Sequence, residues 1–358
     1  MPRIKDAAVE AAAEALTAVE KASDTVAHLA ARAEVAAGDA VAAAPAAVAR
    51  SLPGDTARLA LGVGMSFGVG VLGRWGVNYL AKGEGVDGML EDVRDDGVVV
   101  GWKILVLALG WLGDFDGWDL ASLALLSHGP ATFLVSVFYG IRWLTAGAYL
   151  GVEVVSTALP FLLLRHFSAD KETAPTPNKE IVADRWIQAL TSLQAGLVYS
   201  VVLFLAGRTF LSDVFVLHFE GIPTVKPAVE PAGIFVGADG IATGVLGLLM
   251  GWAARRFIFA PVVTAPEGTV KDEENERFDP ASASLGETVK WNLWGWKDKT
   301  KVSVVRTGAA VVATVVGTYL DTALGIRGVD QVGAGVYAGV WGLAVVLTGV
   351  VLTYVGSI

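Results

Sequence analysis

The sequence predicts an all-α protein: a polytopic membrane helix bundle of about seven transmembrane helices (roughly six to eight), preceded by an Ala-rich extramembrane helix. Of its 358 residues, 54% are hydrophobic and 18% are charged, whereas a soluble domain carries about 25% charged residues. The mean hydropathy is +0.55, and the apolar residues gather in blocks long enough to cross a bilayer core of about 30 Å as helices. These observations exclude a soluble enzyme, a secreted disulfide scaffold and a disordered chain.

Charge and cysteine content restrict the kinds of site and of membrane that we expect for the protein. The formal net charge is −9, and zero cysteines exclude disulfides, thiolate metal sites and a cysteine nucleophile. Ala, Val, Gly and Asp dominate while lysine is scarce, a halophilic composition that resembles haloarchaeal proteomes. We therefore expect a multi-pass protein of a cell membrane, with a virion membrane as the alternative.

Residues 1–52 predict one long peripheral amphipathic helix, because Ala and Glu, which dominate there, are strong helix formers. Its larger apolar residues fall on one thin stripe: Ile4, Val9, Leu16, Val19, Val26 and Leu29. The pattern favours a solvated or loosely self-associating helix, and a membrane-surface or partner-docking helix is the alternative. Pro53 and Gly54 end this helix, and residues 53–358 form the predicted membrane bundle.

The apolar blocks of the bundle predict its spans. They lie at about 59–78, 98–114, 131–158 or longer, 187–209, 233–258, 303–322 and 332–356. The third block continues to residue 167 without a polar turn, so we interpret 131–167 as one long tilted helix that Pro160 kinks. Two short spans joined by a turn at Gly147 or Gly151 are the alternative.

The distribution of basic residues predicts the topology through the positive-inside rule. Lys and Arg gather in the loops 165–186 and 255–302, whereas the connections 115–130, 210–231 and 323–331 contain few. With seven spans, both basic loops and the C-terminus lie inside and the N-terminal helix lies outside. An eight-span alternative brings the N-terminal segment inside, together with the acidic stretch Asp114–Asp119.

Several spans carry glycines four residues apart, which allow helices to approach closely in lipid. The predicted helix-packing glycines are Gly64, Gly68, Gly147, Gly151, Gly240, Gly244, Gly335 and Gly339. They favour packing within the chain or between subunits, and lining of a narrow pathway is the alternative. Their spacing also suggests tandem two-helix repeats at about 98–165, 187–258 and 303–356.

Ionisable groups deep in lipid are costly and usually functional. The candidates for a polar intramembrane pathway are Arg142, Glu153 and Asp239. Arg142 and Glu153 are eleven residues apart in the predicted third helix, so both project from one face. They line one polar track or meet partners from other helices. The alternative is that Arg142 holds neighbouring carbonyls and Glu153 lies near the inner interface. We expect Lys103, close to the inner end of the second span, to snorkel.

No pattern predicts a catalytic or metal site. Three aspartates in Gly113–Asp119 resemble part of a calcium loop, but the distal Glu is missing, so we expect an acidic interfacial turn anchored by Trp111 and Trp118. The four histidines, at positions 28, 128, 166 and 218, have no ligand spacing. We therefore expect no metal, no cofactor, no nucleic acid and no enzymatic activity.

An interfacial helix is predicted at 284–299. Ser284 and Glu287 form a capping box at its start. Trp291, Trp294 and Trp296 alternate with lysines, a combination typical of the lipid headgroup level. We expect this helix to anchor the sixth span on the inner membrane surface and, secondarily, to bind anionic lipid.

The sequence thus favours a channel or facilitator-type transporter for an ion or small solute. The alternative is a non-catalytic structural or assembly protein that acts through helix–helix packing. Its partners would be the lipid bilayer and further copies or a membrane complex. Convergence of Arg142, Glu153, Thr314, Thr318 and Tyr319 on one cavity would favour transport, and a dry bundle would favour assembly.

Overall fold

The computed structural model describes residues 55–81, 97–165, 177–223, 238–266 and 283–357, with isolated positions between the last three ranges. The chain divides into two units, Met1–Arg58 and Leu59–Ile358. The predicted N-terminal helix at 1–52 lies outside the described residues. The described helices belong to the second unit, apart from residues 55–58, which belong to the first.

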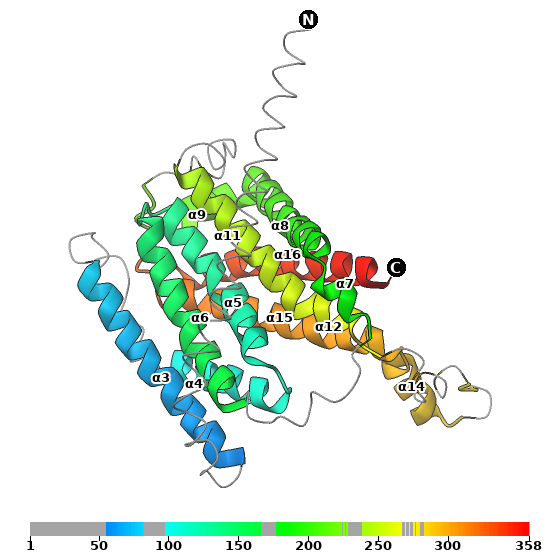
Figure 1. Cartoon of the computed structure of the whole chain (residues 1–358). Coiled ribbons are helices and arrows are strands. Elements are labelled where there is room, and N and C mark those ends of the chain that lie inside the picture. The colour runs from blue at the N-terminus through cyan, green and yellow to red at the C-terminus, as the bar shows by residue number, and fades with distance from the viewer. Residues whose placement is uncertain are drawn as a thin grey trace, which may run out of the picture. The chain divides into compact units, whose positions relative to one another are not determined.

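The described regular elements are helical. They are α3 (Asp55–Leu80), α4 (Gly97–Leu112), α5 (Gly117–Val137), α6 (Trp143–Arg165), α7 (Lys179–Ala183), α8 (Arg185–Ala206), α9 (Ser212–His218), α11 (Ala238–Ala254), α12 (Ala260–Val263), α14 (Leu285–Trp294), α15 (Asp298–Ala323) and α16 (Gln331–Ser357) (Figure 1). The π-helical turns Gly207–Leu211 and Arg255–Phe259 join α8 to α9 and α11 to α12. Seven helical stretches in the described part of the chain are long and apolar enough to cross a membrane. The protein is therefore an all-α, multi-pass membrane protein, as predicted.

The interpretation of 131–167 as one long helix is wrong. Helix α5 already begins at Gly117 and ends at Val137, and α6 starts afresh at Trp143. Gly140, with φ +72°, makes the turn between them, because only glycine adopts this left-handed conformation at little cost. Three of its residues, Phe138, Tyr139 and Ile141, are buried and give no sign of a loop. Its one charged residue is the exposed Arg142, which the long-helix interpretation had placed inside a span.

The predicted topology, with the acidic stretch and the basic loops at opposite ends, is also wrong. Helices α5 and α6 run antiparallel side by side, so that Gly117 approaches Leu162. Asp116 and Asp119 at the start of α5 pair with Arg256 and Arg306. We call this end of the bundle, where α5 and α15 begin, the basic end. The arrangement corresponds to the eight-helix alternative, with α4 as a shorter apolar helix.

Helix α5 lies at the centre of the packing. It contacts α6, α15 and α11, and most of its side chains are buried. At the end opposite the basic end, the connections after α5, α9 and α15 meet: Tyr139 donates to the Glu220 carbonyl, and Phe219 bridges to Val329. Helix α5 therefore positions any site between α6 on one side and α15 on the other.

The predicted packing glycines face outward. A Cβ added at Gly64, Gly68, Gly147, Gly151, Gly244, Gly335 or Gly339 would meet nothing within 4 Å, and the surroundings of Gly240 lie outside the described side chains. Close helix contacts occur at other glycines, such as Gly196 of α8, where a Cβ would lie 3.0 Å from the Gly247 carbonyl of α11. Packing of the predicted glycines between copies stays a prediction. So does the tandem repeat, whose first unit, 98–165, holds three helices.

Candidate functional site

A buried carboxylate with two cationic partners lies among helices α3, α4 and α6. Glu153 on α6 accepts hydrogen bonds from Arg74 Nε and Nη2 on α3, at 2.9 and 2.6 Å. Its second oxygen accepts from Lys103 Nζ on α4 at 3.2 Å, and Lys103 also donates to Ser156 Oγ at 2.9 Å. The side chains of Glu153 and Lys103 are only 11% and 18% exposed. Three helices thus hold one ion-pair group in the membrane-spanning region.

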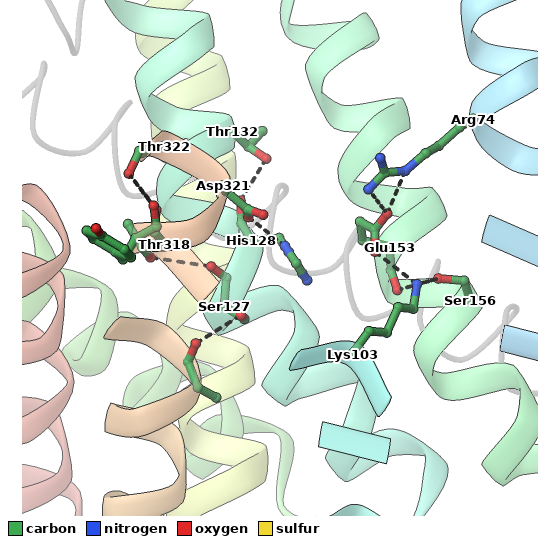
Figure 2. A network of polar contacts seen from close by, with 12 residues as sticks. Arg74, Lys103, Ser127, His128, Thr132, Glu153, Ser156, Thr318, Asp321 and Thr322 are labelled. Atoms are coloured by element: carbon green, nitrogen blue, oxygen red, sulfur yellow. Dashed lines mark hydrogen bonds and ion pairs between the residues drawn. The ribbon is translucent and has the colours of Figure 1, made fainter. Parts of the chain in front are cut away.

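A second charged pair lies on the other side of α5. His128 Nδ1 on α5 lies 2.6 Å from Asp321 Oδ2 on α15, and both side chains are about a quarter exposed. Figure 2 shows the His128 ring extending from Asp321 toward the side where Lys103 and Glu153 lie. We call Arg74, Lys103, His128, Glu153 and Asp321 the charged cluster.

Buried hydroxyl groups fix the helices beneath the charged cluster. Ser127 Oγ donates to the Ala313 carbonyl at 2.9 Å, and Thr318 Oγ1 donates to the Ser127 carbonyl at 3.3 Å (Figure 2). Gly317 lets α5 approach α15 closely at Ser127. These contacts hold His128 and Asp321 in register, because Ser127 precedes His128 and Thr318 lies one turn before Asp321.

The five members of the charged cluster line one cavity of about 60 Å³. The remaining lining residues are Val99, Trp102, Val106, Leu123, Ala124, Ser127, Thr157, Ala313 and Leu320. A buried water needs roughly 10–15 Å³ of such volume and two to four polar partners, so the cavity has room for a few waters. A second cavity, also about 60 Å³, lies between α3 and α4 and shares Arg74, Val99 and Lys103 with the first.

The three residues predicted to line a polar pathway have different positions in the structure. Glu153 lies in the cavity and meets partners from two other helices. The placement of Arg142 deep in a helix is wrong: it is exposed in the connection before α6, where its carbonyl accepts from the Thr145 and Ala146 amides. The side chain of Asp239 lies outside the described ones.

The hydroxyl-bearing residues of α15 do not converge on the cavity as the transport prediction required. Thr314 and Thr318 are fully buried, but neither these two nor Tyr319 lines the cavity.

Sequence reasoning missed four of the five cluster residues. Lys103 was expected to snorkel and Asp321 was not among the candidates, but both line the cavity. His128 was hidden because 115–130 was interpreted as a connection, and Arg74 because it lies near the end of its span. One signal was present: each of these charges stands alone in a long apolar stretch, where an ionisable residue needs a partner.

The acidic motif at 113–119 caps a helix and binds two arginines. Asp116 accepts from the Asp119 amide at 2.5 Å as N-cap of α5, and Asp119 completes the capping box. Asp119 is also ion-paired with Arg306 at 2.7 Å. Among the described residues, no group of three or more His, Asp or Glu side chains is arranged to hold a metal.

The predicted capping box of the interfacial helix is confirmed. In α14, Ser284 Oγ accepts from the Glu287 amide, and Glu287 accepts from the Ser284 amide. Trp291 is engaged within the chain, stacked on Phe278 with its Nε1 donating to the Asn275 carbonyl at 2.9 Å. Trp294 and Trp296 are 48% and 40% exposed. They stay the predicted membrane-interface residues.

Comparison of the chain with models of known protein families, with curated proteins and with solved structures gives no match.

Proposed function

We propose that this membrane protein is a channel or facilitator-type transporter for an ion or small solute, without enzymatic activity, and that the charged cluster is part of its pathway. One observation carries the proposal. Five ionisable side chains from five helices, α3, α4, α5, α6 and α15, line a single cavity among apolar spans. Burying charge in a membrane protein is costly, and such residues usually mark ion or substrate pathways.

The composition of the charged cluster fits a pathway better than an anchor. An ion pair that only holds two helices together needs one satisfied pair. Here two separate groups line the same cavity: Glu153 with its two cations, and the His128–Asp321 pair. A buried pair contributes little net stability relative to apolar residues of similar volume. A function is therefore the simpler reason for keeping both groups in one cavity.

Flux measurements on purified protein in liposomes test this proposal. The panel covers protons, potassium, chloride and small neutral solutes, and compares the wild type with Glu153→Gln and Arg142→Ala. Glu153→Gln raises the net charge of the cavity by one unit, which in a partly desolvated site should change the permeant flux on the order of tenfold. Arg142→Ala is the matched control, because Arg142 is exposed outside the cavity and its flux should equal that of the wild type. Background flux from all three proteins across the panel would sink the transport proposal.

A structural or assembly role is the second candidate, favoured by the outward-facing glycines. Gly335 and Gly339 on α16, like Gly147 and Gly151 on α6, leave open space beside the helix backbone. Small residues of this kind allow close helix approach in lipid. Gly339→Leu should then weaken self-association measured by single-molecule photobleaching in bilayers, without changing folding. A monomeric wild type at all protein-to-lipid ratios would contradict self-association through this face.

A further inference from the structure

We propose that the ion bound and passed on by the charged cluster is the proton, and that His128 is the side chain that takes it up. This inference rests on the proposed transport function and names the substrate of the same site. It follows from the size of the cavity, the signs of the charges around it and the orientation of His128.

The size of the cavity restricts what it can hold. About 60 Å³ admits a few waters and no organic solute of ordinary size. A hydrated metal ion or halide would have to lose most of its water shell in order to enter. Protons need no such space, because they move along hydrogen bonds between side chains and waters.

The charges around the cavity disfavour other ions of either sign. Arg74 and Lys103 repel entering cations, while Glu153 and Asp321 repel entering anions. With four groups charged and His128 neutral, the formal charge of the cluster is zero, since two positive and two negative charges cancel. Uptake of one proton by His128 brings the cluster to +1, and the nearby cations then favour its release.

The geometry of His128 leaves one ring nitrogen for the cavity. Nδ1 lies 2.6 Å from Asp321 Oδ2, so the carboxylate fixes the neutral tautomer with the proton on Nδ1. The second nitrogen, Nε2, then holds the lone pair, and His128 lines the cavity. A proton that is passed along hydrogen-bonded waters reaches Nε2 from the last of these waters, which is left neutral. The imidazolium formed is stabilised by Asp321 and returns the proton to another water.

The charged groups that face His128 come from four helices. They are Arg74 on α3, Lys103 on α4, Glu153 on α6 and Asp321 on α15. Helix α11 also packs against α5, and its described side chains, from Gly244 to Ala254, include no ionisable group.

A second group of charges near α5 lies at the basic end. Arg256 and Arg306 pair there with Asp116 and Asp119, and the buried Arg255 precedes Arg256 in the same π-helical turn. None of these five residues lines the cavity. Proton uptake by His128 is therefore governed by the four cavity charges.

Proton flux into liposomes tests the proposal with the full chain. The vesicles contain a pH-sensitive dye, and a potassium gradient with valinomycin supplies the driving force. The wild type should acidify or alkalinise the lumen faster than empty vesicles, and His128→Gln should slow this flux on the order of tenfold or more, because the relay loses its proton acceptor. His218→Gln is the matched control. His218 makes the same Nδ1 contact, 2.7 Å from Asp330, but lies at the end of α9 away from the cavity.

The outcomes separate the inference from the function on which it rests. If the wild type carries potassium, chloride or a solute but no protons, the proton inference is overturned and the transport function stands. If it carries nothing, both fail. Should His128→Gln fold poorly by gel filtration, Asp321→Asn provides the second variant. Asp321→Asn leaves the imidazole in place and removes the charge that stabilises the imidazolium, so proton flux should fall and should recover at lower pH. Unchanged proton flux in either folded variant would overturn the role of His128.

Discussion

The ion pair at the basic end allows a quantitative test of how the bundle is held together. Arg306 on α15 lies 2.7 Å from Asp119 on α5, and the two side chains are only 17% and 11% exposed. The guanidinium also lies between two aromatic rings, 4.6 Å from Phe115 and 4.9 Å from Phe257. Three segments that are distant in sequence therefore meet at one cation. The perturbation is a double-mutant cycle of Asp119→Asn and Arg306→Met.

The magnitudes follow from these contacts. Removing one member of a buried pair costs about 3–5 kcal/mol, and the remaining exposure of both side chains lowers this to about 2–3 kcal/mol for Asp119→Asn. Arg306→Met also loses two cation–π contacts of about 0.5–1 kcal/mol each, which brings its cost to about 3–5 kcal/mol. The double variant should cost about 2 kcal/mol less than the summed costs of the two single variants, because the second substitution no longer leaves a buried charge without a partner.

The assay is reversible unfolding in mixed micelles, with the free energy of unfolding extrapolated to zero denaturing detergent. Asp119→Asn preserves the side-chain acceptor of the capping box, so loss of the helix cap does not account for its effect. Additive effects of the two substitutions, or losses below about 0.5 kcal/mol for each, would refute the reasoning.

Three further predictions concern other parts of the described bundle. Arg255 is 4% exposed, and its buried Nε has no hydrogen-bond partner among the described residues. Arg255→Leu should therefore raise the free energy of unfolding by about 1–3 kcal/mol; a loss would show that the guanidinium binds something. At Gly251 a Cβ would lie 2.9 Å from the Gly196 amide and meet the Ser192 carbonyl. Gly251→Ala should therefore cost about 2–3 kcal/mol, whereas Gly339→Ala, with open space around it, should be neutral in the same assay; equal effects would contradict this packing. Asp272 accepts from the Asp298 amide at the start of α15, and this bond holds its pKa below the usual value. The stabilisation from the Asp272 carboxylate is present above the unfolded pKa of about 3.9 and is lost as pH falls through the folded pKa. In an acid titration followed by circular dichroism, Asp272→Asn should therefore lose less stability below about pH 4 than the wild type. Identical titration curves would count against the hydrogen bond.

The sequence predicted the fold class because span length and apolar composition are local properties. The spans at 59–78, 303–322 and 332–356 coincide with α3, α15 and α16. The turn at 138–142 was missed because Phe138, Tyr139 and Ile141 are apolar and buried, and the exposed Arg142 was interpreted as a charge deep in one long helix. Tertiary packing decided that boundary.

The candidate site was predicted only through Glu153, which stands alone in its apolar segment. Its partners Arg74 and Lys103 are 79 and 50 residues away in sequence, and no periodicity within one helix reveals such pairs. For a similar reason the glycine motif did not identify the close helix contacts within the chain. Spacing by four marks a flat helix face, but only the neighbouring helix decides whether this face is used, as at Gly196 and Gly251.

Both functional proposals depend on water in the cavity between His128 and Glu153, and an experimental density map of the protein in lipid nanodiscs at about 2 Å resolution measures this directly. We expect ordered water density that bridges the His128 ring to the Glu153 group, since a polar cavity of this size is normally hydrated. Apolar side chains packed into this space, or a dry gap between the two groups, would contradict the pathway.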